Sequence, residues 1–230
     1  MIPIKDDNPT TIQPIVTLSV IGSCILVFFW QRSLGQEGGQ AAVYALGFIP
    51  AVLFGSADLP VQLAWVPAPV TIFTSMFLHG GVLHLAGNML YLWIFADNIE
   101  DSMGHGRFIV FYALCGVAAA LAQAAPEIGS TIPMIGASGA VSGVLGAYVL
   151  LYPHARVLVV VPLVVILYTM RLPAFVVLGI WFAGQLLSSL AAPAVGGGIA
   201  FRAHLGGFVA GLVLIRLFTI RRPTRKRVRR

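Results

Sequence analysis

The chain has 230 residues, of which 58% are hydrophobic and only 10% are charged, and its mean hydropathy is +0.92. A soluble domain carries about 25% charged residues, so this composition excludes an ordinary soluble fold and indicates a polytopic membrane protein. The net charge is +6, and the basic residues gather at the C-terminus, a pattern that is typical of a topology signal and only occasionally of nucleic-acid binding.

Six apolar stretches are candidates to cross the roughly 30 Å hydrocarbon core of a bilayer, which takes about 20 mostly apolar residues per helix. We expect these spans at residues 13–31, 80–99, 107–125, 136–152, 172–191 and 202–220. The fourth is short and rich in glycine, which fits a helix enclosed by other helices. The predicted fold is an all-α membrane protein, a bundle of six transmembrane helices over residues 13–220.

The segments outside these spans complete the predicted organisation. Residues 1–12 are expected to form a cytoplasmic N-terminus that leads into an uncleaved signal anchor. Residues 32–69 form a long external loop with short interfacial helices, because a loop of this length usually has structure or function of its own. Residues 157–170 are apolar but too short to span and contain Pro162, so we expect them at the cytoplasmic interface.

The basic tail at residues 221–230 sets the predicted orientation. Positive residues favour the cytoplasmic side, and six spans then bring the N-terminus to the same side. The expected location is the inner (plasma) membrane of a prokaryote, with both termini cytoplasmic. Cys24 and Cys115 lie in apolar spans as small hydrophobic residues, so we expect neither a disulfide framework nor a metal site, and no cofactor.

Two polar residues stand inside predicted spans. Ser138 belongs to the run Gly-Ala-Ser-Gly at residues 136–139, and His204 opens the last span. An ionisable residue in hydrocarbon costs free energy unless it is paired or faces water, so His204 is a functional hypothesis. Gly-x-x-x-Gly spacings in both helices indicate close packing, which would bring Ser138 within hydrogen-bond reach of His204. The two are a candidate nucleophile and general base.

The second span begins with His79, His84 and Asn88. His84 and Asn88 are four residues apart, so they share one helix face, and both can donate a side-chain N–H. Donors aimed at a developing alkoxide form an oxyanion hole. The alternative is a pair of interhelical hydrogen bonds that stabilises the bundle. His79 is expected to support the preceding loop.

Taken together, these motifs resemble the rhomboid family of intramembrane serine proteases. The matching pattern covers residues 79–211: His-x-x-x-x-His-x-x-x-Asn, then Gly-Ala-Ser-Gly, then Ala-His-x-x-Gly-x-x-x-Gly. The resemblance implies a Ser138–His204 dyad without an acidic third member. It also implies an oxyanion hole made of the Ser138 N–H, His84 and Asn88, and a site that opens to water on the external side. Substrates would be transmembrane segments cut near that boundary.

The chain departs from the family pattern at two places. Val70 and Thr71 stand where many members have a Trp-Arg pair in the first loop. Ser142 stands where some members have a tyrosine that stacks on the histidine, so the orientation of His204 must come from another residue. The stretch from Glu100 to Gly104 matches a family pattern, and we expect it to have a structural role in a cytoplasmic turn.

Two other functions stay open. A small polytopic transporter would also place polar groups in a glycine-rich bundle, although the sequence shows no obvious internal repeat. A catalytically inactive rhomboid-like protein that binds membrane clients would need none of the four polar residues. Other intramembrane proteases are excluded, because the sequence lacks His-Glu-x-x-His and no mid-membrane aspartate pair can form. The expected partners are membrane-protein substrates and the lipid bilayer, and no nucleic acid.

Overall fold

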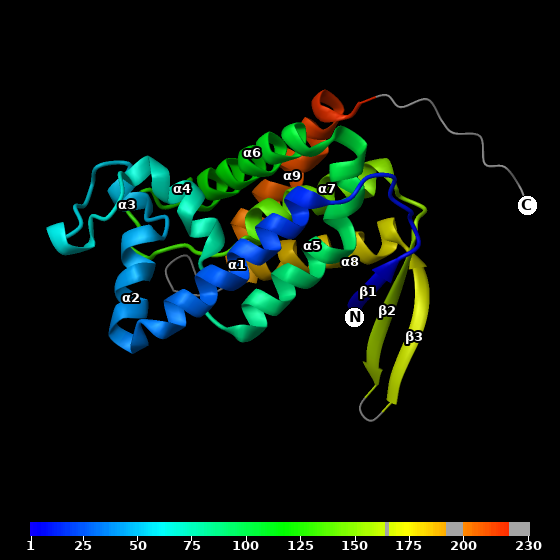
Figure 1. Ribbon diagram of the computed structural model, residues 1–230, viewed down its shortest axis with the longest axis horizontal. Helices are drawn as coiled ribbons and strands as arrows, with labels where there is room; N and C mark the ends of the chain where they lie inside the picture. Colours follow the sequence, from blue (N-terminus) through cyan, green and yellow to red (C-terminus); the bar gives the residue numbers. More distant parts are fainter. Residues whose placement is uncertain (164–165, 192–199, 221–230) are drawn as a thin grey trace, which may run out of the picture.

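The computed structural model describes residues 1–163, 166–191 and 200–220. The predicted basic tail at 221–230 and residues 164–165 of the predicted interfacial segment lie outside the described residues. The fold is mostly helical, with long helices packed side by side (Figure 1). These helices are α1 (Ile15–Ser33), α5 (Val82–Met103), α6 (His105–Ala124), α7 (Ser138–Leu151), α8 (Ala174–Ala191) and α9 (Phe201–Phe218). Each predicted span coincides with one of them.

Four of these helices, α1, α6, α8 and α9, are long and apolar enough to cross a membrane. A fifth candidate joins residues 61–77 to α5, with a bend of 83° between the two parts. The remaining helix, α7, is apolar but has only 14 residues. At 1.5 Å per residue it is about 21 Å long, which is shorter than the hydrocarbon core. The chain is therefore a multi-pass membrane protein in which one helix is too short to face lipid along a full span.

Helix α7 lies in the middle of the bundle. Its residues Gly139–Tyr148 are all buried, and it packs against α5, α6 and most extensively α9. A Cβ atom on Gly207 or Gly211 of α9 would collide with the carbonyls of Gly139 and Gly143 of α7. The backbones of α7 and α9 are thus in direct contact, as the Gly-x-x-x-Gly spacings predicted.

The expectation of an all-α fold is wrong at one end of the bundle, where the chain forms a three-stranded antiparallel sheet (Figure 1). Its order is β1 (Ile2–Asp6), β2 (Arg156–Leu163) and β3 (Ile166–Pro173). The predicted interfacial segment 157–170 makes up most of the β2–β3 hairpin, so in its described part it does not cross as a helix. β-Branched residues dominate β2, and the alternate residues Val157 and Val159 are fully buried, which is the period of a strand.

Pro162 is tolerated in β2 because of where it lies. β1 pairs only with Val157–Val160, so Pro162 lies beyond the end of β1. The N–H that proline lacks therefore has no partner to bond in β1. The hairpin projects from the end of the bundle where α7 ends and α8 begins (Figure 1).

The predicted long loop at 32–69 contains short helices and turns. These are α2 (Gly35–Leu46), α3 (Pro50–Leu53) and 3-10 turns at Val61–Leu63 and Ala68–Val70, followed by α4 (Thr71–Thr74) and a turn at Ser75–Phe77. Phe48 is fully buried and exchanges two backbone hydrogen bonds with Met134, at 3.0 and 2.8 Å. This segment therefore braces the stretch of chain that leads into α7.

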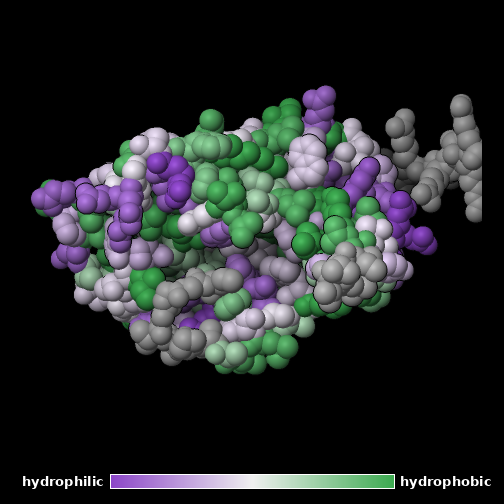
Figure 2. All heavy atoms as spheres, turned by 90° about the horizontal axis from the view of Figure 1, so that it is seen from below, coloured by the Kyte–Doolittle hydropathy of each residue, from purple (hydrophilic) through white to green (hydrophobic). Residues whose placement is uncertain are grey.

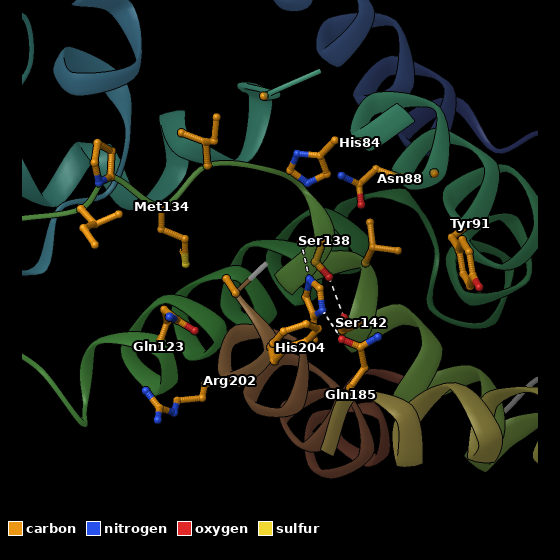
Figure 3. A pocket seen from close by; sticks show the side chains of 18 of the residues that line it. His84, Asn88, Tyr91, Gln123, Met134, Ser138, Ser142, Gln185, Arg202 and His204 are labelled. Atoms are coloured by element: carbon orange, nitrogen blue, oxygen red, sulfur yellow. Dashed lines mark hydrogen bonds between the residues drawn. The ribbon is translucent and has the colours of Figure 1, made fainter. Parts of the chain in front are cut away.

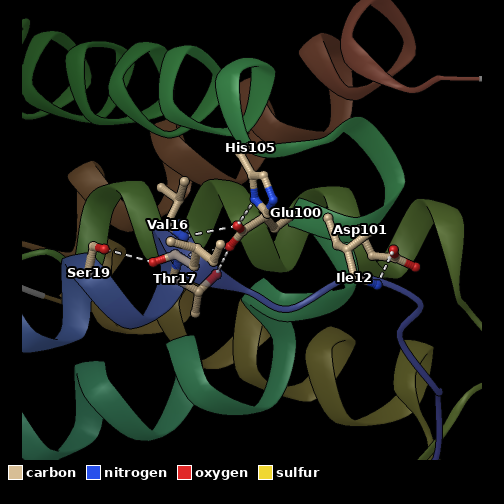
Figure 4. Close-up of polar contacts among 8 residues, drawn as sticks. Ile12, Val16, Thr17, Ser19, Glu100, Asp101 and His105 are labelled. Carbon is tan, nitrogen blue, oxygen red and sulfur yellow. Dashed lines mark hydrogen bonds and ion pairs between the residues drawn. The ribbon is translucent and has the colours of Figure 1, made fainter.

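Glu100, near the end of α5, connects the start of α1 to the turn between α5 and α6 by hydrogen bonds (Figure 4). Its fully buried carboxylate accepts bonds from the Val16 N–H at 2.9 Å, the Thr17 N–H at 2.8 Å and the Thr17 hydroxyl at 2.6 Å. Nδ1 of His105 lies 2.5 Å from the same carboxylate. Because the N-terminus of a helix has unpaired N–H groups and positive partial charge, a carboxylate stabilises it. Gly104, at φ 79°, lets the chain reverse from α5 into α6.

Candidate active site

A cavity of about 700 Å³ lies beside the N-terminus of α7. It is lined by side chains from five helices, α5 to α9, and by the stretch of chain before α7. The four residues predicted as a site all line it: His84, Asn88, Ser138 and His204. Figure 2 shows one face of the molecule, with hydrophobic side chains over its middle, hydrophilic ones toward both ends, and a hollow in the middle that contains hydrophilic side chains. The fold thus gathers polar groups that are far apart in the sequence within an apolar exterior.

Ser138 and His204 are hydrogen-bonded to each other (Figure 3). Ser138 is the first residue of α7, His204 lies in the first turn of α9, and the distance from His204 Nε2 to Ser138 Oγ is 2.8 Å. His204 is only 8% exposed. This is the geometry in which an imidazole can take a proton from a hydroxyl. Because α7 begins at Ser138, its backbone N–H has no acceptor within the helix.

His84 and Asn88 project from α5 toward the residues that lead into α7 (Figure 3). A Cβ atom on Gly136 would lie 2.8 Å from His84 Nε2 and 3.8 Å from Asn88 Nδ2, so glycine is needed for this close approach. Asn88 Nδ2 is buried and has no hydrogen-bond partner among the described residues. A buried donor without a partner is costly, so it is poised to bind an acceptor that enters the cavity.

His79 stands apart from this cluster. Its Nδ1 lies 3.2 Å from the carbonyl oxygen of Phe77, and its ring packs edge-on against His84, with ring centroids 5.2 Å apart. The side chain is 1% exposed and does not line the cavity. His79 therefore supports the loop before α5 and the ring of His84.

Two residues that the sequence reasoning missed contact His204, and both come from α8. Gln185 Oε1 lies 2.7 Å from His204 Nδ1, and the Trp181 ring lies 6.0 Å from the imidazole, between centroids. The available signal was the spacing: Trp181 and Gln185 are four residues apart in a predicted span, so they share one face. Ser142, in contrast, donates its hydroxyl proton to the Ser138 carbonyl at 2.6 Å.

The cavity offers no evident metal site. Within the described ranges, no group of three or more His, Cys, Asp or Glu side chains is arranged to hold a metal ion. Cys24 and Cys115 are both buried and form no disulfide.

The family model for the rhomboid domain matches residues 67–221, a stretch that contains His84, Asn88, Ser138 and His204. The chain belongs to the rhomboid family. In this rhomboid, the matched domain begins just before the 3-10 turn at Ala68–Val70 and includes all of α4 to α9, while strand β1 and helices α1 to α3 precede it.

Individual rhomboid relatives support the same assignment. Rhomboid protein 1, mitochondrial, of Saccharomyces cerevisiae is 32% identical over 191 residues, which cover 74% of this chain and 51% of the yeast protein. Rhomboid protease GluP of Bacillus subtilis is 34% identical over 137 residues, covering 59% and 24%. Presenilin-associated rhomboid-like protein, mitochondrial, of Mus musculus is 30% identical over 146 residues, covering 60% and 35%. The chain thus spans about half the length of the yeast relative and less of the others.

Proposed function

We propose that this rhomboid is a serine endopeptidase that cleaves transmembrane segments of membrane proteins near the external boundary of the bilayer. The observation that carries the proposal is the 2.8 Å hydrogen bond between Ser138 and His204 inside a cavity of the helix bundle. A membrane-client binder or a transporter would not need this pairing of a nucleophile with a base. One relative, GluP, is named a rhomboid protease.

In the proposed reaction, Ser138 Oγ attacks the carbonyl carbon of the scissile peptide bond while His204 Nε2 takes its proton. The carbonyl oxygen becomes an oxyanion, which accepts hydrogen bonds from the Ser138 N–H, His84 and Asn88. The tetrahedral intermediate collapses to an acyl-enzyme, and the amine leaves with the proton from His204. Water then attacks the ester with His204 again as the base, which releases the second product and restores Ser138.

We infer a six-span topology with residues 1–12 and 221–230 in the cytoplasm. β1 pairs with β2, from Ile2 opposite Val160 to Asp6 opposite Val157, so the two strands must lie on the same side. Four of the predicted spans, α1, α5, α6 and α7, lie between them in the sequence, and an even number of crossings returns the chain to the same side. The positive-inside rule then makes this side cytoplasmic. Residues 32–69 fall outside, and the hairpin over 157–170 stays inside without crossing.

The shortness of α7 supports cleavage near the external boundary. If the C-terminal end of α7 lies at the cytoplasmic boundary of the hydrocarbon, about 21 Å of helix leaves Ser138 about 9 Å below the external boundary. A transmembrane substrate is therefore cut within the outer part of the bilayer. Water must reach Ser138 through the cavity. The expected partners are accordingly membrane-protein substrates and lipid.

The location in a prokaryotic plasma membrane stays a prediction, because relatives are named both as mitochondrial proteins and as a bacterial protease. The topology is tested with Val160→Cys in a cysteine-free background and an impermeant thiol reagent. Protection of the cysteine in intact cells, with labelling after lysis, supports the six-span arrangement. Labelling in intact cells contradicts it.

The activity is tested by incubating the detergent-purified protein with a panel of single-span substrates. We expect cleavage by the wild type and background rates for Ser138→Ala and His204→Ala, because a dyad acts as a unit. Ser142→Ala is the matched control: it removes a neighbouring serine that bonds only the Ser138 carbonyl and should retain activity. A fluorophosphonate should label the wild type at Ser138.

Undiminished cleavage by Ser138→Ala would refute the serine-protease mechanism. A wild type that captures the substrates but neither cleaves them nor reacts with the fluorophosphonate would favour the client-binding alternative.

A further inference from the structure

Gln185 supplies the second hydrogen bond of the His204 ring. Its Oε1 lies 2.7 Å from His204 Nδ1, while the opposite ring nitrogen, Nε2, lies 2.8 Å from Ser138 Oγ (Figure 3). Building on the proposed function, we propose that Gln185 is a positioning residue, which holds His204 in the tautomer and orientation needed to take the proton of Ser138.

The choice of tautomer follows from the chemistry of the amide oxygen. A carbonyl oxygen can only accept hydrogen bonds, so a neutral imidazole bonded to Gln185 Oε1 carries its proton on Nδ1. This leaves a lone pair on Nε2, directed at Ser138 Oγ, and only this form can act as a base toward the serine. With the proton on Nε2 instead, the ring would donate to Oγ and could not deprotonate it. The bond to Gln185 therefore selects the competent tautomer of His204.

Trp181 restrains the plane of the same ring. It lies one helical turn before Gln185 on α8, and its ring is tilted by 36° against that of His204 at 6.0 Å between centroids. Trp181 is itself held between Tyr91 of α5, at 6.4 Å, and Phe208 of α9, at 6.2 Å. One face of α8 thus contacts the imidazole twice: Gln185 bonds to its Nδ1, and the ring of Trp181 packs against it.

This arrangement explains how His204 is oriented without an aromatic residue at position 142. Ser142 is buried, and its hydroxyl donates its proton to the carbonyl of Ser138 and has no ring to stack on His204. A neutral amide also suits this half-buried place, because a carboxylate in the same position would add a charge that has to be desolvated. Orientation of the base is therefore assigned to α8.

Helix α8 is buried against the bundle mainly in its first half. Its buried residues, Ala174, Val177 and Leu178, all lie in the first two turns, and Gln185 stands well beyond them. Displacement of this part of α8 from the bundle would break the contacts of Trp181 and Gln185 with His204 together. The orientation of the base therefore depends on how the second half of α8 is docked.

The test compares Gln185→Leu with Gln185→Glu in the purified full-length protein. Leucine removes the acceptor at similar volume, and we expect kcat to fall about 5- to 100-fold with a smaller change in KM, while the protein stays folded. Glutamate restores an acceptor and adds a negative charge that stabilises the imidazolium. It should recover much of the activity and move the acidic limb of the kcat/KM profile to higher pH. Leu187→Ala, at a 67% exposed position on α8, is the control expected to leave kcat unchanged.

Retention of kcat by Gln185→Leu within twofold, or a loss that matches a measured loss of folded protein, overturns the proposal. An unmoved acidic limb in Gln185→Glu also overturns it, since a merely structural glutamine has no effect on that limb.

A second readout does not depend on activity. The ring 15N resonances of His204, assigned by their absence in His204→Ala, should report the Nδ1–H tautomer in the wild type and a mixture in Gln185→Leu. The same tautomer populations in both proteins refute the role of Gln185. An inactive wild type would instead refute the proposed function, and the resonances would still decide what Gln185 does.

Discussion

Glu100→Ala is expected to destabilise the protein by about 3–6 kcal/mol. The variant leaves three donors at the start of α1 without their acceptor: the Val16 N–H, the Thr17 N–H and the Thr17 hydroxyl. Each buried donor that loses its partner costs about 1–3 kcal/mol. We take the lower part of the combined range, because the Thr17 hydroxyl can rotate toward a backbone carbonyl of its own helix. The loss also removes a negative charge from the positive end of α1.

The measurement is unfolding in detergent, by heat and by titration with a denaturing detergent, for the wild type and two variants. Asp101→Ala is the matched control, because the neighbouring carboxylate accepts bonds from the Thr11 hydroxyl at 2.7 Å and the Ile12 N–H at 3.2 Å nearer the surface. It should cost clearly less than Glu100→Ala, because water can replace a lost acceptor near the surface. If Glu100→Ala and Asp101→Ala destabilise the protein equally, the buried carboxylate does not hold α1 in the way described.

Three further predictions concern the cavity, the helix contact and the sheet. Asn88→Ala should lower kcat by about 10²–10³ with a smaller change in KM, yet still react with a fluorophosphonate; normal cleavage would make Asn88 a structural residue. Gly211→Leu should reduce both folded protein and activity, because its side chain meets the α7 backbone, whereas Gly22→Leu, with open space around it, should be tolerated; equal melting temperatures would contradict this. Burial raises the pKa of the Asp6 carboxyl above its usual 3.8, so the folded state binds this proton more tightly than the unfolded state, and stability should fall as pH rises above about 4. Asp6→Asn should make the melting temperature less dependent on pH in that range, and an unchanged slope would show that Asp6 does not contribute.

The helices were predictable because hydrophobic length and glycine spacing are local signals. The sheet was not, for two physical reasons. A short apolar run such as Val157–Met170 fits a strand or an interfacial segment equally well when only its composition is considered. Its partner strand, around Ile2, lies before the first helix, and only the folded bundle brings the two together.

In the candidate site, too, some residues were predictable from local sequence and others only from the tertiary structure. Ser138, His204, His84 and Asn88 stand in recognisable motifs, and the structure places all four in one cavity. Gln185 has no such motif, and its spacing from Trp181 shows only that the two share a helix face, not that this face contacts a histidine 19 residues later. Its contact depends on how α8 packs against α9, which is a property of the tertiary structure.

The position of β1 ahead of the first helix has a consequence for biosynthesis. Ile2 pairs with Val160, so the ribosome has to synthesise the whole of α7 and the first residues of β2 before the sheet can form. At 5–20 residues per second, this interval is about 8–30 s. During that time β1 has no strand to pair with, and water must satisfy its backbone. In the proposed six-span topology, the sheet therefore cannot guide the insertion of α1, α5, α6 and α7, and it forms only after these helices have been synthesised.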